Sequence, residues 1–227
     1  MPTESTRAHA KPVAEHRLRT PNSAGFAGIA FALLTLTFMT LIQTALPADP
    51  PSDPGWLTEK ETQVTVAVTM VPFAAIAFLW FIGVLRDLLG RREDQFFGTV
   101  FLGSGLLFLA GMFVWVGTIA AALASSNASP VEFAESPAYV FAASLIKVMG
   151  SDVILRMAGV FMFSSATMWL RTEALPRPLI VLTYAGALAL LVGGPVLGPV
   201  RMAFPLWVLV VSVMILVLHR RTTSAPR

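Results

Sequence analysis

The 227-residue sequence contains no cysteine, and this absence excludes several classes of function at once. Disulfide bonds, thiol catalysis and iron–sulfur clusters all require cysteine sulfur. Histidine is scarce as well: His9 and His16 lie near the start of the chain, and His219 lies near its end. Because none of them lies within a long apolar run, the sequence predicts no haem or other cofactor and no metal site.

Nucleotide-binding motifs are also missing. Neither GxxxxGK[ST] nor GxGxxG occurs in the sequence. The tripeptide GSG superficially resembles the glycine frame of a serine protease, but no intramembrane histidine accompanies Ser104. We interpret the tripeptide as a place where helices pack closely. The sequence therefore favours a protein that is not an enzyme.

Charged residues are scarce as well, and their low number indicates the class of protein. Charged residues make up 13% of the chain against 56% hydrophobic residues, and the mean hydropathy is +0.73. A soluble domain of this length would carry more apolar surface than a single core could cover. The lipid bilayer is therefore the expected partner of that surface, and no nucleic-acid partner is expected.

The apolar runs predict an all-α, polytopic membrane protein, a bundle of about six transmembrane helices. A helix needs ~20 mostly apolar residues to cross ~30 Å of hydrocarbon. The expected spans are 24–46, 64–85, 96–123, 150–170, 178–194 and 202–218. The stretch GGPVLGPVRMAFP leaves open whether 178–218 forms two full spans or includes a re-entrant segment.

The two ends of the chain are polar. Residues 1–23 predict a disordered, basic leader and residues 219–227 a short tail, both cytoplasmic, on either side of the transmembrane domain 24–218. The first apolar run is longer than the 7–15 residues typical of a signal-peptide core. We therefore expect an uncleaved first helix.

Lysine and arginine indicate how the chain is threaded. With the N-terminus inside, 12 of the 16 basic residues fall in cytoplasmic segments, including the three arginines of the 86–94 connection. The sequence thus predicts a plasma-membrane protein with both termini cytoplasmic.

The acidic residues of the outer loops, such as Asp49 and Asp53 in PADPPSDPG, lack the spacing of a calcium site and predict a solvated loop. The five tryptophans lie mostly near the expected membrane interfaces, as aromatic belts require, and only Trp169 is placed tightly at a boundary.

One polar stretch stands out against the apolar background. The sequence SLIKVMGSDVILRMAG places Lys147, Asp152 and Arg156 on the way into the fourth span. Asp152 and Arg156 have the i, i+4 spacing that favours an ion pair on a helix. Counted from Leu170 at ~1.5 Å per residue, both lie in the outer part of the hydrocarbon layer. An ionisable residue there predicts either a structural ion pair or a polar site for a substrate, a lipid headgroup or a proton.

Polar residues on the first two spans are candidates for the lining of that site. They are Gln43, Thr44, Gln63, Thr65 and Thr69. Each threonine alone is explained by a hydrogen bond to its own helix backbone. Together with Asp152 and Arg156 they predict an outward-facing polar pocket.

The stretch FLWFIGVLRDLLGRREDQFFGTVFLGSGLLF resembles uncharacterised multi-pass membrane proteins of high-GC actinobacteria. The excess of arginine over lysine, 13 to three, fits such a genome. The resemblance covers mainly the second and third expected spans. It implies a multi-pass membrane fold and no particular activity or site residue.

Two functions rank ahead of a membrane enzyme, which would need a carboxylate-only or lipid-headgroup mechanism without a metal-ligating cluster. We expect a non-catalytic accessory or structural subunit of a membrane complex, with a membrane-protein partner or a second copy of the chain. The alternative is a small transporter or channel-like protein for a lipid or small solute, with Asp152 and Arg156 at its binding site.

Overall fold

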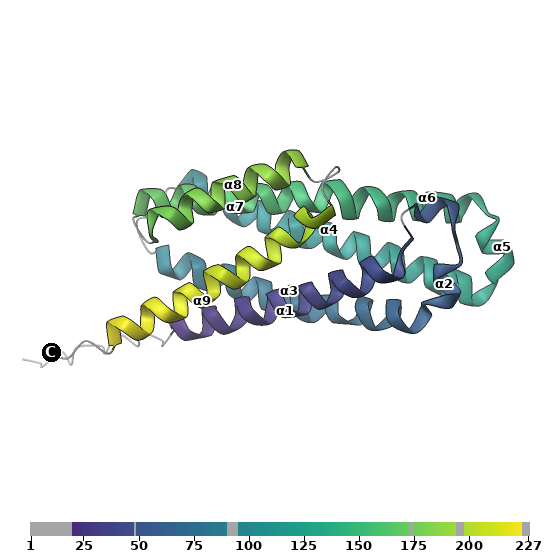
Figure 1. The fold of residues 1–227 in the computed structure, drawn as a ribbon, viewed down its shortest axis with the longest axis horizontal. Coiled ribbons are helices and arrows are strands. Elements are labelled where there is room, and N and C mark those ends of the chain that lie inside the picture. The colour runs from purple at the N-terminus through teal and green to yellow at the C-terminus, as the bar shows by residue number, and fades with distance from the viewer. Residues whose placement is uncertain (1–19, 48, 90–94, 173–174, 194–197, 224–227) are drawn as a thin grey trace, which may run out of the picture.

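The structure is a computed structural model that describes residues 20–47, 49–89, 95–172, 175–193 and 198–223 (Figure 1). These residues form helices with no strand among them, which confirms the expected all-α bundle. In chain order the elements are α1 (Thr20–Ala45), η1 (Pro50–Ser52), α2 (Trp56–Glu59), α3 (Glu61–Leu89), α4 (Gln95–Ala128), α5 (Pro130–Ala134), α6 (Pro137–Val148), η3 (Met149–Val153), α7 (Ile154–Thr172), α8 (Arg177–Gly193), η4 (Gly198–Met202) and α9 (Ala203–Thr223).

Five helical stretches are long and apolar enough to cross a membrane: 25–45, 61–86, 96–128, 137–172 and 200–217. The fifth span expected from the sequence is α8, an apolar helix that is shorter, at 17 residues. The fourth is longer than expected, because α6 runs through the π-helical turn η3 into α7 without a break. Residues 1–19 of the predicted leader, residues 90–94 and residues 194–197 lie outside the described residues. The last four residues of the predicted leader, 20–23, form the first turn of α1.

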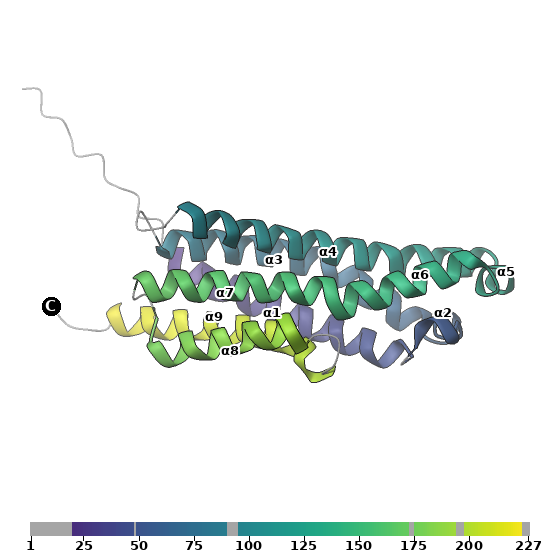
Figure 2. The same ribbon diagram turned by 90° about the horizontal axis from the view of Figure 1, so that it is seen from above.

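The helices form two packed groups. α1 lies against α3 and α9, whereas α7 lies against α4 and α8. Both views show α8 and α9 beside one half of the long helices only (Figures 1 and 2). We call that half the proximal part. The other half, the distal part, contains η1, α2, α5, α6 and the adjoining ends of α1, α3 and α4.

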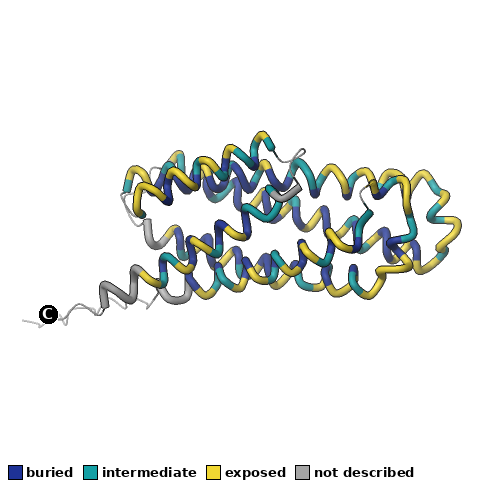
Figure 3. The backbone as a smooth tube through the Cα atoms, viewed as in Figure 1, coloured by how far each residue is buried: buried dark blue, intermediate teal, exposed yellow. Residues whose placement is uncertain are grey.

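A cluster of five phenylalanines joins the two groups in the proximal part. Each of the five long apolar stretches contributes one ring, and each side chain is at most 2% exposed. Ring centroids lie 4.6 Å apart for the first and second rings, 5.2 Å for the second and third, and 4.8 Å for the third and fifth. We call this group the phenylalanine cluster; its members are Phe31, Phe78, Phe108, Phe161 and Phe204. The burial pattern of the bundle is shown in Figure 3.

Four of the five tryptophans, which the sequence places mostly near the expected interfaces, are buried within the bundle. Only Trp80 is exposed, at 64%, whereas Trp56, Trp115, Trp169 and Trp207 are buried. Trp169, which the sequence placed at a membrane boundary, stacks on Trp207 with ring centroids 5.7 Å apart. These indole rings therefore contribute to packing between the helices.

The exposed side chains change in kind along the bundle axis. Trp115 lies at the transition: its ring is 5.3 Å from that of Phe38, and it packs against Gly150. On the proximal side, α1, α3, α4 and α7–α9 expose mostly large apolar residues, including Leu33, Phe73, Ile76, Leu79, Leu106, Leu107, Phe113, Phe163, Val181, Leu188 and Val210. On the distal side, α1, α3 and α4 expose mostly small or polar residues, including Thr40, Gln43, Thr44, Thr62, Thr65, Thr69, Ala121, Ala124, Ser125 and Asn127.

Candidate functional site

The distal end is closed by a compact cap, in which the connection between α1 and α3 packs against α6. Pro50, Trp56, Leu57 and Tyr139 are all buried there. The Tyr139 hydroxyl accepts a hydrogen bond from the Trp56 indole at 3.3 Å and faces the carbonyl oxygens of Pro50 and Asp53. The proline-rich loop, which the sequence predicts to be solvated, is therefore anchored on α6. Its two carboxylates remain exposed.

Tyr139 is the residue whose loss should open this cap. In a Tyr139→Phe variant the Trp56 indole and one loop carbonyl lose their partner in a buried place, at a cost of about 1–3 kcal/mol. We expect a lower melting temperature and faster labelling of a cysteine introduced at Ser52. The other tyrosine provides the control, because Tyr184 is only part-buried and pairs with Thr167. Equal labelling of Ser52→Cys in both tyrosine variants would contradict this role.

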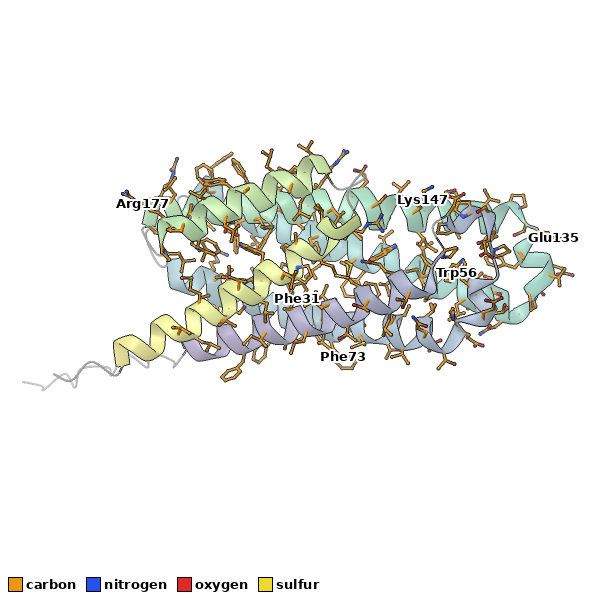
Figure 4. All side chains as sticks on the ribbon, in the orientation of Figure 1. Phe31, Trp56, Phe73, Glu135, Lys147 and Arg177 are labelled. Carbon is orange, nitrogen blue, oxygen red and sulfur yellow. The ribbon has the colours of Figure 1, made fainter. Side chains whose placement is uncertain are left out.

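An ion pair holds the same loop from outside. Lys147 Nζ lies 2.8 Å from Asp49 Oδ1, and both side chains are more than half exposed. Lys147 and Glu135 lie at the distal end and Arg177 at the opposite end (Figure 4). The structure thus pairs Lys147 with the loop, whereas sequence spacing grouped it with Asp152 and Arg156. No pattern in the sequence signals this contact, because the two residues are far apart in the chain.

The pair predicts a dependence on pH. The Lys147 ammonium holds the pKa of Asp49 below its ordinary value, against a smaller opposing effect of desolvation. A carboxyl whose pKa is lowered by folding stabilises the folded state above its unfolded pKa of about 4, and this contribution disappears as the pH falls through the folded pKa. The melting-temperature difference between the native protein and Lys147→Gln should therefore shrink as the pH falls below about 4. A difference that stays constant there would show that the lysine acts through another contact.

The second polar feature surrounds the π-helical turn η3. Arg156 Nη2 lies 2.8 Å from Asp152 Oδ1, the i, i+4 pair that the spacing predicted. Oδ1 is buried, yet no donor reaches it with hydrogen-bond geometry. From the α4 side, the buried indole nitrogen of Trp115 also has no partner. A π-helical turn often accompanies a functional site, because its wider backbone leaves groups unpaired.

The residues predicted to line a pocket fall in different surroundings. Gln63 donates to the Leu41 carbonyl at 2.8 Å and to the Thr44 hydroxyl at 2.7 Å, and so ties α3 to α1. Thr69 is exposed and its hydroxyl donates to the Thr65 carbonyl of its own helix. Gln43 and Thr65 are exposed as well. These side chains lie mostly on the outer surface of the distal part. Polar groups there are better solvated by water than by lipid.

The grouping of metal-ligating side chains and the comparison with known proteins both bear on the function of the chain. Within the described ranges, no three histidine, aspartate or glutamate side chains are grouped so that they could hold a metal ion. Comparison with protein-family models, with curated proteins and with solved structures finds no match to this chain. The function must therefore be argued from the geometry of the bundle and of its distal end.

Proposed function

We propose that the protein is a non-catalytic accessory or structural subunit of a membrane complex. The observation that supports this proposal best is the phenylalanine cluster, which fills the middle of the bundle with rings from the five long apolar stretches. A solute path would need polar groups along the axis. Apart from tyrosine and tryptophan, the described polar residues that are buried as a whole are serines and threonines: Thr35, Ser104, Ser126, Ser164, Ser165, Thr183 and Ser212.

The proximal part fits the thickness of a bilayer. From Gln95 to Val114, α4 spans about 20 residues, or ~30 Å, which equals the hydrocarbon thickness. Beyond that level the helix continues to Ala128 for about 14 residues, or ~20 Å. The distal part would then project from the membrane and present its surface, including the 70%-exposed side chains of Val131 and Phe141, to a partner subunit.

The orientation that suits this arrangement has the distal part outside the cell. Among the described charged side chains, the arginines Arg86, Arg171 and Arg177 lie at the proximal end. Basic residues favour the cytoplasmic side. This supports a plasma-membrane protein with both termini cytoplasmic.

The orientation is testable with single cysteines, since the natural chain has none to remove. Cysteines at Ser52 and Ser129 should react with a membrane-impermeant maleimide added to intact cells. A cysteine at Gln95 should react only after the membrane is permeabilised. Labelling of Gln95→Cys in intact cells would reverse the proposed threading.

The accessory role is testable by extraction of the native membrane into lipid discs, followed by mass spectrometry. We expect a companion in fixed stoichiometry that cross-links to a photoreactive residue at Phe141 and much less to one at Phe73. Phe73 is the matched control, because it is 62% exposed on the proximal surface. A product of twice the chain mass would identify a second copy as the companion. A lone chain without cross-links at Phe141 would overturn the proposal.

The alternative, transport of a lipid or small solute, is supported by one observation. Asp152 and Arg156 form a partly exposed ion pair beside a π-helical turn. Replacing Asp152 by Asn would leave the arginine unpaired and should lower the folded yield, whereas apolar residues at both positions should restore it. If the double variant folds and supports the complex as well as the native chain does, transport at this pair is excluded.

A further inference from the structure

The short helix α8 leaves a ledge on the surface of α7. The two helices are antiparallel and touch at Gly159, where an added Cβ would lie 2.9 Å from Leu191 Cγ and 3.1 Å from the Ala187 carbonyl oxygen. At equal rise per residue, the last residue of α8, Gly193, is level with about residue 156 of α7. α7 and η3 therefore continue beyond the end of α8.

Asp152 and Arg156 lie on this ledge. Asp152 precedes Gly159 by seven residues, about two helical turns, which places it on nearly the same face of the helix. Arg156 is three residues from Gly159 on the adjoining face. The ion pair thus lies where the side of α7 that α8 covers ends. Helical side chains lean toward the N-terminus of their helix, so these two side chains lean in the distal direction, away from α8.

The pair retains unused hydrogen-bonding capacity. The Arg156 side chain is 53% exposed and that of Asp152 31% exposed. A guanidinium carries five N–H donors in a planar fork that matches the oxygens of a phosphate. The carboxylate accepts from several donors, and its buried Oδ1 receives no hydrogen bond of good geometry. The ledge therefore offers donors for an anion and, one turn away, acceptors for a cation.

The surroundings are apolar on the membrane side. Phe163, two turns further along the exposed side of α7, is 49% exposed, and Leu188 and Val192 on α8 are 62% and 72% exposed. From Arg171 at the proximal end, Arg156 is ~22 Å and Asp152 ~28 Å away along the helix, close to the far boundary of a ~30 Å hydrocarbon layer. A ligand of the ledge would thus have a charged headgroup at the boundary and acyl chains along α7 and α8.

We propose that the ledge binds a phospholipid with a primary-amine zwitterionic headgroup, such as phosphatidylethanolamine. Arg156 contacts the phosphate and Asp152 accepts hydrogen bonds from the ammonium. A choline headgroup presents no N–H donor to the carboxylate, and a glycerol headgroup presents no cation. The site accordingly prefers the ethanolamine lipid over phosphatidylcholine and phosphatidylglycerol of the same acyl composition. This inference does not depend on the proposed role as a subunit.

The test measures the occupancy of dioleoyl lipids by native mass spectrometry of the purified full chain, with the melting temperature as a second readout. The native protein should retain the ethanolamine lipid in preference to the other two. Arg156→Gln should lose about tenfold or more of that occupancy, because a charge-assisted contact is removed. Asp152→Asn should retain phosphate-dependent binding of all three lipids and lose the preference among them.

Lys147→Gln is the matched control, because it removes an exposed cation from the same continuous helical stretch, one whose partner is the loop. It should leave the lipid preference unchanged. If Arg156→Gln does not fold, Arg156→Lys keeps the charge and should weaken occupancy several-fold by losing the planar fork. Equal retention of the three lipids by the native protein, or undiminished preference in the arginine variants, would overturn the proposal. Stabilisation by inorganic phosphate alone, matching that by the lipid, would identify a free anion instead and overturn the lipid assignment.

Discussion

Replacing Phe78 by alanine should cost about 3–5 kcal/mol of stability, the largest loss that we expect from any single truncation in this chain. The Phe78 ring is fully buried and touches the other four rings of the phenylalanine cluster: 4.6 Å to Phe31, 5.2 Å to Phe108 and Phe161, and 5.8 Å to Phe204, measured between ring centroids. Its removal leaves a cavity that rings on four other helices cannot fill, because each is already held by its own helix. Dispersion contacts are lost on every side.

The control is on the same helix and uses the same substitution. Phe73→Ala removes a side chain that is 62% exposed on the proximal surface, so the variant loses few contacts within the protein. We expect a melting temperature within experimental error of the native protein. For Phe78→Ala, a drop of at least about 6 °C is expected in the same detergent, taking about 2 °C per kcal/mol. Similar losses for both variants would show that the cluster does not hold the bundle together.

The second large effect is expected at Gly28, where α1 and α9 meet at close range. A Cβ at this position would lie 1.9 Å from Ser212 Oγ and 2.7 Å from Phe81 Cδ2. Gly28→Ala should therefore separate α1 from α9 and α3, with a loss of about 1–3 kcal/mol. Gly103→Ala is the control, since no heavy atom would lie within 4 Å of its Cβ. Alanine is also the better helix former, so that variant should match or exceed the native stability.

A double replacement makes this prediction sharper. Ser212 is fully buried and its hydroxyl has no hydrogen-bond partner, so the side chain has little to lose. Gly28→Ala combined with Ser212→Gly moves the methyl-sized group from one helix to the other and should recover part of the stability. Thermal unfolding of the four proteins gives the coupling energy between the two positions. Absence of any recovery would show that the clash with Phe81 decides the outcome.

Gly103 and Gly117 also show the limit of composition as a guide to packing. Five glycines along α4 suggest a helix at the centre of a bundle, but these two face open space. Gly105 instead packs against Ile82 and Phe161, and Gly111 packs against Ile154. Sequence periodicity marks the positions that permit a close approach. It does not say which of them a neighbouring helix uses.

The polar residues of the distal part also show that composition is a limited guide to which residues contact one another. The threonines of the first two spans suggested a pocket, because hydroxyls within an apolar helix need a reason. The long helices instead continue past the level of Trp115, and the exposed face beyond it carries threonine, glutamine and serine. The Gln63 side chain, one of the predicted lining residues, donates to Thr44 and to the backbone of α1.

What the sequence determined by itself follows from local or compositional physics. Its apolar runs exceed what a soluble core can cover, which determines a helical membrane protein, and the i, i+4 spacing determines the contact of Asp152 with Arg156. Tertiary structure decided the rest: the convergence of five phenylalanines, the anchoring of the proline-rich loop by Tyr139 and Lys147, and the ledge beyond α8. These features join residues far apart in the chain, and helix rotation and register, which select their contacts, are set by side-chain packing between helices rather than by any helix alone.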